Sequence, residues 1–220
     1  METHSPLGAS GAVRWMTCAG SVSLSRGVKE DEWLADDTYS SVGTVAHSLA
    51  AECLITGEEP WTRIGSKGDN SEVIIDKDMA DAVQVYLSAI NSCGPGTRTW
   101  IEYGFHCPSL HDLFYGTVDF ARLDEAARVL EVNDYKHGAG IAVDVQGNPQ
   151  CMYYACGILE ANDLWGAVDV VRLGIIQPRG FHYDGPMRYW SITTILLRRW
   201  LDDVLIPAMR KALNSDETKS

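Results

Sequence analysis

The chain has 220 residues, 45% of them hydrophobic, and a formal net charge of −12 at pH 7. This composition supports one well-packed core, so we expect a single domain over residues 1–220 with flexible ends at 1–9 and 214–220. Its apolar runs are too short for the roughly 20 residues of a membrane span, and its start lacks the features of a secretory signal. The sequence therefore argues against a membrane protein and predicts a cytoplasmic protein with reduced cysteines.

Apolar residues at helical spacing predict two long helices in the first half of the chain. One is expected at Ser41–Ile55 and the other at Asp76–Ser92. A short helix within Ser10–Ser23 is expected to bury Trp15. The segment Trp61–Glu72 has little periodicity and is predicted to be a loop.

The second half of the chain predicts a sheet with further helices packed on it. Three strands come first, then a helix, then two more strands and a last helix capped by Thr193 or Thr194. This order predicts an α/β fold with a central mixed β-sheet flanked by helices. The strands are expected at Thr99–His106, Phe114–Leu123, Val129–Tyr135, Val168–Gln177 and Arg188–Ile192, and the helices at Asn148–Leu159 and from Thr193 or Thr194 to Leu213.

The second and third strands read as a hairpin with its turn at Ala126 and Ala127. Positions whose numbers sum to 253 are then opposite each other, which places Asp119 against Asp134 with Cβ atoms about 5 Å apart. Two like charges this close repel unless a cation lies between them. Strand alternation puts Lys136 on the same face as Asp134. Such a cluster suits metal-assisted phosphodiester hydrolysis, and the alternative is an ordinary surface ion pair on a hairpin.

Four short motifs follow one another in an order that one nuclease family shares. In this order they resemble the PD-(D/E)XK nucleases, and within them the RecB-like and lambda-exonuclease-like branch in its phage and prophage versions. The similarity covers about Ser10 to Arg179 and implies a restriction-endonuclease-like core. The motifs are Gly43-Thr44-Val45-Ala46-His47, Gly116-Thr117-Val118-Asp119, Asp134-Tyr135-Lys136 and Gln150-Cys151-Met152-Tyr153-Tyr154.

The resemblance implies a centre for Mg²⁺ or Mn²⁺. His47, Asp119 and Asp134 would be its side-chain ligands, and the backbone carbonyl of Tyr135 would supply a further oxygen. Lys136 would orient or activate the attacking water and stabilise the charge that develops on the phosphate.

The resemblance also assigns a role to the helix that follows the lysine. Gln150 and Tyr154 are four residues apart and so share one helix face. They are expected to contact the phosphate or the strand end and to support Lys136. Judged by residue type alone, Gln150 would face solvent and His47 would be a packed or surface histidine. Glu52 lies about 140° around the helix from His47 and is not expected to bind the metal.

These features predict a divalent-metal-dependent deoxyribonuclease, an exonuclease of phage recombination or DNA processing acting in the host cytoplasm. An endonuclease with the same site and a non-catalytic phage interaction module of this fold are the alternatives. The expected partners are DNA and a phage recombinase or single-strand annealing protein, and a homo-oligomer is left open. The acidic net charge favours the module, since nucleic-acid binding usually needs a basic surface. The C-terminal third has a positive bias that we expect on a solvated helix face: Arg188, Arg198, Arg199 and Arg210.

Overall fold

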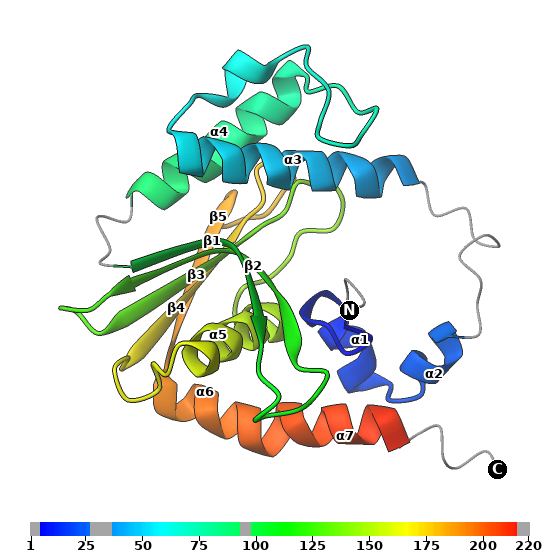
Figure 1. Cartoon of the computed structure of the whole chain (residues 1–220), viewed down its shortest axis with the longest axis vertical. Helices are drawn as coiled ribbons and strands as arrows, with labels where there is room; N and C mark the ends of the chain where they lie inside the picture. The colour runs from blue at the N-terminus through cyan, green and yellow to red at the C-terminus, as the bar shows by residue number, and fades with distance from the viewer. Residues whose placement is uncertain (1–4, 27–36, 93–97, 215–220) are drawn as a thin grey trace.

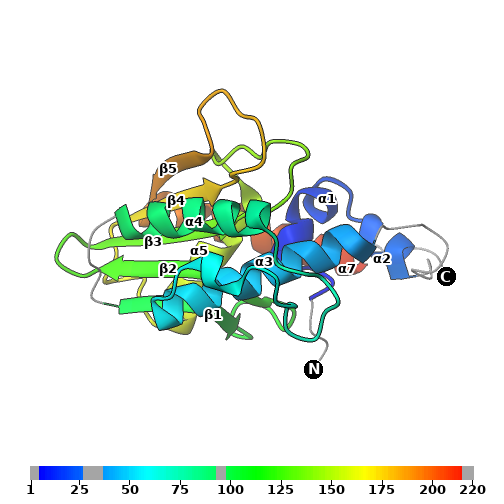
Figure 2. The ribbon, with the colours of Figure 1, turned by 90° about the horizontal axis from the view of Figure 1, so that it is seen from above.

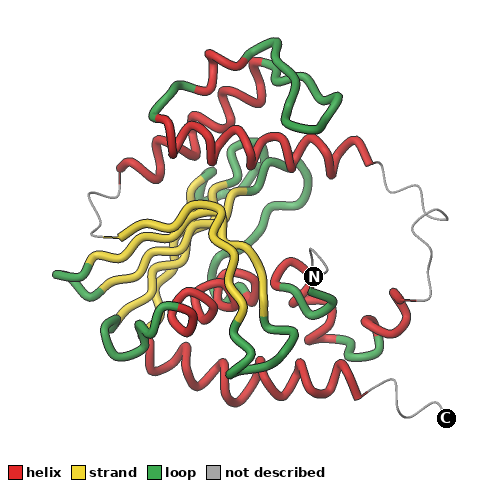
Figure 3. The backbone as a smooth tube through the Cα atoms, in the orientation of Figure 1, coloured by secondary structure: helices red, strands yellow, loops and turns green. Residues whose placement is uncertain are grey.

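The computed structural model describes residues 5–26, 37–92 and 98–214. They form three layers, in which a five-stranded sheet lies between a pair of helices on one side and a group of helices on the other (Figures 1 and 3). This α/β architecture with a mixed sheet confirms the predicted class and is consistent with a restriction-endonuclease-like core. No helix in these three ranges is long and apolar enough to cross a membrane.

The strands follow one another across the sheet in chain order. The β3–β4 pair is parallel, and the other three neighbouring pairs are antiparallel. Because parallel neighbours end at the same edge, the connections that leave β3 and β4 begin side by side. The strands are β1 (Arg98–His106), β2 (Tyr115–Asp124), β3 (Val129–Tyr135), β4 (Val170–Ile176) and β5 (Met187–Thr193).

The helices divide between the two faces of the sheet, as Figure 1 shows. α3 (Asp37–Thr56) and α4 (Lys77–Ser92) cover one face, and α5 (Pro149–Ala161) packs on the other. The remaining elements are η1 (Ala9–Gly11), α1 (Ala12–Thr17), α2 (Ser21–Arg26), η3 (Pro60–Arg63), α6 (Thr194–Trp200), the π-helical turn η4 (Leu201–Leu205) and α7 (Ile206–Asn214).

The sheet separates two apolar cores. The smaller core packs α3 and α4 on the sheet through residues such as Leu49, Val83 and Phe120. The larger core surrounds α5, whose residues 151–159 are all buried. Gly157 permits the close approach of this helix, because a Cβ atom there would lie 2.3 Å from the ring of Phe105. The helix expected to carry Gln150 is thus fixed firmly against the sheet.

The β1–β2 hairpin bends away from the rest of the sheet near its middle (Figure 1). The β2–β3 ladder ends at the Phe120–Asn133 pair, whereas the β1–β2 ladder continues to the His106–Tyr115 pair. The sheet therefore opens beside the C-terminal end of β3.

Three sequence expectations need correction. Residues 5–9 are ordered, since Leu7 and Ala9 are buried and the hydroxyl of Ser5 donates to the carbonyl oxygen of Leu113 at 2.7 Å. The segment 5–9 is too short to show a periodic hydrophobic pattern, so the sequence alone did not indicate that it is ordered. The last helix is interrupted by η4, and the expected loop at 61–72 contains part of η3 and an isolated bridge between Lys67 and Ile74. Residues 1–4 and 215–220 of the expected flexible ends lie outside the described ranges, as does Cys93.

Candidate metal centre and active site

The predicted hairpin register is confirmed, and it places Asp119 next to Asp134. Paired positions in β2 and β3 sum to 253, and Asp119 and Asp134 occupy the first position beyond the last pair. At this point a side chain replaces the backbone ladder, because the Tyr135 amide donates to Asp119 Oδ2 at 2.7 Å. Asp119 therefore closes the opening in the sheet with its own carboxylate.

A third carboxylate belongs to the same row. Paired positions in β1 and β2 sum to 221, as in Ile101–Phe120 and Tyr103–Val118, so Glu102 lies opposite Asp119. Glu102 has a φ of 44°, a left-handed backbone that an L residue with a side chain adopts only at some cost. It lies where the hairpin bends, and the row Glu102, Asp119 and Asp134 crosses three adjacent strands.

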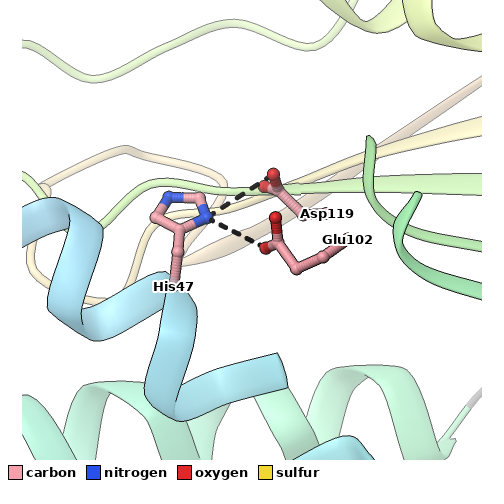
Figure 4. A group of neighbouring side chains, drawn as sticks. All are labelled: His47, Glu102 and Asp119. Carbon is pink, nitrogen blue, oxygen red and sulfur yellow. Dashed lines mark ion pairs between the residues drawn. The ribbon is translucent and has the colours of Figure 1, made fainter. Parts of the chain in front are cut away.

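His47 reaches this row from α3 (Figure 4). Its Nδ1 atom is 3.5 Å from Asp119 Oδ1 and 3.8 Å from Glu102 Oε1. The Tyr135 ring, in the smaller core, supports the imidazole with ring centroids 5.3 Å apart. Burial alone would lower the pKa of His47, but Asp119 and Glu102 outweigh it and raise that pKa to about 10. In the metal-free site the protonated imidazole is thus the positive charge among the carboxylates.

The buried end of the row is organised by Gln150. Its Oε1 accepts from Lys136 Nζ at 2.9 Å, and its Nε2 lies 3.0 Å from Asp134 Oδ1 and 3.1 Å from the Tyr154 hydroxyl. Lys136 Nζ is also 3.0 Å from Asp134 Oδ2. Asn148 caps the helix by accepting from two backbone amides, including that of Gln150. The start of α5 therefore fixes both the lysine and the aspartate.

Asp134 is an unusual group to find buried. Burial raises its pKa to about 6, opposed by Lys136 and reinforced by Asp119. Its Oδ2 has no hydrogen-bond donor in suitable geometry, although the ammonium of Lys136 lies close by. A buried carboxylate oxygen with an unused lone pair is a fitting ligand for a cation.

The separations among the ligand atoms also suit one cation. The candidate atoms of His47, Glu102 and Asp119 all lie within 4.8 Å of one another. Two ligands bound at about 2.1 Å would be about 3.0 Å apart at right angles and about 4.2 Å apart on opposite sides. Carboxylate oxygens with one imidazole nitrogen suit Mn²⁺ or Mg²⁺. The donor set and its spacing therefore fit a hard divalent ion.

The residues differ strongly in exposure to solvent. The side-chain exposure is 39% for Glu102 and 31% for His47, but 12% for Asp119 and 3% for Asp134. The row is thus open at one end and closed at the other. A charged substrate can approach the Glu102 end, while Lys136 and Gln150 hold the far end.

The structure brings together six of the predicted side chains: His47, Asp119, Asp134, Lys136, Gln150 and Tyr154. Tyr135 contributes its amide to Asp119 and its ring to His47, and its carbonyl ligand role stays a prediction. Tyr153 belongs to the core, where its ring stacks on Phe114 at 4.2 Å.

Two other expectations can now be judged. Glu52 pairs with Arg63 and so is engaged elsewhere, in line with its exclusion from the centre. Arg188 was expected on a solvated helix face, which is wrong. It lies in β5, is buried, and donates to the carbonyl oxygens of Val143 and Gly185 and to Gln177 Oε1. Because Arg188 lies in a strand beside two loops, its guanidinium bonds these loops and is not on the surface.

Glu102 is the site residue that the sequence analysis missed. Its position follows from the β1–β2 register, which depends on the connection at 107–114, where no turn motif fixes the pairing. An acidic residue between apolar neighbours in a strand was the available signal.

The sequence profile of a family described as "Protein of unknown function (DUF2800)" matches residues 4–220. The chain belongs to this family. The match spans every element described above, from η1 to α7, and with it all residues of the candidate centre. The family description names no activity.

Proposed function

We propose that the chain is a divalent-metal-dependent deoxyribonuclease of the PD-(D/E)XK type, acting as an exonuclease. The observation that carries the proposal is the row of three carboxylates with His47 at its open end and Lys136 at its closed end. A scaffold protein gains nothing from such a cluster, since like charges in one place destabilise the fold. The exonuclease form rests on the resemblance to lambda-exonuclease-like enzymes.

The residues divide the work of phosphodiester hydrolysis between them. A cation held by His47, Glu102, Asp119 and Asp134 would neutralise phosphate charge and supply an activated water. The ammonium of Lys136 has three donors, of which Gln150 Oε1 takes one and Asp134 Oδ2 attracts another. The third can meet a phosphate oxygen, where charge develops in the transition state.

Gln150 and Tyr154 act by positioning that ammonium. Both sit on the buried side of α5, and Gln150 spans the space between Lys136 and Asp134. Their role is to keep Nζ beside the metal ligands without making it one of them. An amide suits this task because it accepts from the lysine and donates to the aspartate at once.

The deciding experiment incubates purified protein with end-labelled linear and circular DNA in Mg²⁺, Mn²⁺ or EDTA. We expect metal-dependent loss of nucleotides from linear ends, abolished in Asp119→Ala and in Asp134→Ala. Asp203→Ala, which removes an exposed carboxylate in η4, is the matched control and should cleave normally. Cleavage of circular DNA would instead show an endonuclease. Metal-dependent cleavage that survives in either site variant would refute the site.

Lys136→Ala separates catalysis from metal binding. We expect Mn²⁺ affinity to be retained and turnover to fall at least about a hundredfold, the scale for losing one electrostatic partner of the transition state. Calorimetric titration with Mn²⁺ beside a kinetic assay measures the two effects, with Lys211→Ala as the control. Normal turnover at saturating metal would show that Lys136 has another role.

A further inference from the structure

Two loops leave the sheet beside the candidate centre and are tied to each other. Residues 137–147 follow β3 and residues 177–186 follow β4, and Figure 2 shows them projecting together from one edge of the sheet. We call them the paired-loop crest. The side chain of Gln177 bonds the Val143 amide at 3.1 Å, the Gly138 carbonyl at 3.2 Å and the Ile141 carbonyl at 3.1 Å. Arg188 adds a bond to the Val143 carbonyl at 3.0 Å.

The crest is also connected to the metal centre. His137 is buried and lies between the Tyr135 hydroxyl and Arg179 Nη1, each 2.9 Å from a ring nitrogen. Arg179 can only donate, so His137 Nε2 accepts and Nδ1 is left to bond the tyrosine. Tyr135 in turn supports His47. The loops are therefore bonded to each other and, through His137 and Tyr135, to the site.

The two loops expose apolar side chains to solvent. Ile141 and Phe181 are each 92% exposed, and Tyr183 is 84% exposed. The Tyr183 ring is backed by His182, with centroids 4.3 Å apart and an angle of 26° between the planes. Large apolar groups displayed together beside a candidate active site mark a binding surface.

A pocket of about 240 Å³ lies against the crest. Four rings line it, together with four polar side chains. The rings are those of His182, Tyr183, Tyr189 and Trp190, and the polar side chains are those of Asp144, Gln146, Asp184 and Arg188. The combination of flat apolar walls with hydrogen-bonding groups suits a planar, polar-edged ligand.

The position of the pocket relates it to the scissile bond. Met187, at its edge, pairs with Ile176, and Ile176 pairs with Tyr135. Two strand spacings of about 4.8 Å place Met187 about 10 Å from Tyr135, beside the Asp134 end of the metal row and away from its Glu102 end. A strand cleaved at the centre would therefore carry neighbouring nucleotides to the crest.

The charges of the crest select the part of the nucleotide that binds. The exposed carboxylates of Asp144 and Asp184 lie 3.0 Å and 3.9 Å from the ring nitrogens of His182. They would repel phosphates, and they can accept hydrogen bonds from the amino groups of bases. Aromatic rings stack on any base, provided that the base is unpaired.

We propose that the paired-loop crest is a stacking site for unpaired nucleobases, in which Phe181 and Tyr183 hold single-stranded DNA a few nucleotides from the metal centre. This inference deepens the proposed nuclease function and rests on it. It predicts that single-stranded or frayed DNA ends are the preferred substrate.

The test compares base-bearing and abasic single strands of about 12 nucleotides, a length within the site sizes of single-strand binders. Binding is measured with Ca²⁺ in place of Mg²⁺ to block turnover. We expect the wild type to prefer the base-bearing strand by about tenfold or more, and Phe181→Ala and Tyr183→Ala each to lose most of that preference. Ile195→Ala removes an apolar side chain that is 70% exposed, in α6 just beyond the far end of β5, and should retain the preference.

Two further readings make the test specific. Because stacking involves no phosphate, Phe181→Ala should leave the slope of affinity against salt unchanged. Phe181→Leu keeps an apolar group but removes the ring, so it should behave like Phe181→Ala.

The outcomes separate the two proposals. Cleavage of DNA by a wild type that has no base preference, or full preference in Phe181→Leu, would overturn the stacking site alone. A base preference that both alanine variants lose, in a chain that cleaves nothing, would retain the stacking site and overturn the nuclease. A changed salt slope in Phe181→Ala would show that the crest holds phosphates, against the proposal.

Discussion

Glu102 combines a left-handed backbone with a carboxylate at the open end of the metal row. Glu102→Gln keeps the size of the side chain and removes its charge. We expect Mn²⁺ affinity to fall by roughly 10- to 100-fold, while the metal-free protein becomes no less stable because a like charge is lost. Calorimetric titration measures the affinity, and Glu72→Gln, a change at an exposed ion pair, is the control. Unchanged Mn²⁺ affinity would place Glu102 outside the centre.

Asp134 and His47 together predict how pH affects the metal-free protein. The pKa of Asp134 is raised to about 6, so the folded state binds its proton more tightly than the unfolded state does. Its contribution to stability is therefore lost as pH rises from about 4 to about 6. The pKa of His47 is raised to about 10, so its contribution is fully present below about pH 6.5 and is lost as the pH rises from there through about 10.

Both groups thus make the metal-free protein less stable at higher pH, and metal should reverse the trend. In EDTA we expect the Tm to fall between about pH 5 and about pH 9, with Asp134 alone contributing on the order of 2 kcal/mol. The Tm increase on adding Mn²⁺ should grow over the same range, since the ligands must lose their protons to bind metal. Thermal melts at a series of pH values, with Asp134→Asn as the comparison, test this. An Mn²⁺ increment that is independent of pH would contradict it.

At the level of elements, the N-terminal cap of α5 can be tested separately from the site residues that this helix carries. Asn148→Ala removes the cap of the helix that carries Gln150, and Thr193→Ala removes an equivalent cap from α6, away from the centre. Each should lower the free energy of unfolding by about 1 kcal/mol. Only Asn148→Ala should also reduce turnover, because it loosens the support of Lys136. Equal activity in the two variants would show that the cap is unimportant for the site.

The elements that the sequence predicted well are those with short-range signals. The bounds of β3 were predicted to the residue, because β2, the turn and β3 are adjacent in the sequence. The Asn148-Pro149 pair marked the start of α5. Glu102 and Arg188 could not be placed in this way. Their neighbours depend on the bend of the β1–β2 hairpin and on two loops about forty positions apart, which no local pattern encodes.

For the molecule as a whole, the net charge of −12 limits how DNA can be held. Several arginines are already occupied in ion pairs, among them Arg122 with Glu131, Arg128 with Asp169 and Arg198 with Asp202. A protein that neutralises Z phosphates shows a log–log slope of affinity against salt near −0.9Z. We expect a slope that corresponds to roughly two to four phosphates per subunit, measured with Ca²⁺ to block turnover.

The bound cation should account for much of the affinity for DNA. Removing Ca²⁺ should weaken binding sharply, since Asp119 and Asp134 would then repel the phosphate. Arg198→Ala is a useful comparison, because its guanidinium is already paired with Asp202 at 3.0 Å and its loss should leave the slope unchanged. A slope of eight or more phosphates per subunit, insensitive to Ca²⁺, would reveal a basic surface that the described residues do not show.

The parallel pairing of β3 with β4 has a consequence for protein synthesis. His47 and the three carboxylates of the metal row all precede β4 in the chain, whereas the Lys136 amide bonds the carbonyl of Ile176 in that later strand, at 2.8 Å. Residues 130–135 are buried partly by that later strand, so a nascent chain lacking it exposes an unpaired strand edge. The C-terminal end of β3, which carries Asp134, can therefore complete its pairing only after β4 has emerged. A chain that stops before β4 would then lack the strand that completes this edge, so the centre would form only in chains that extend beyond it.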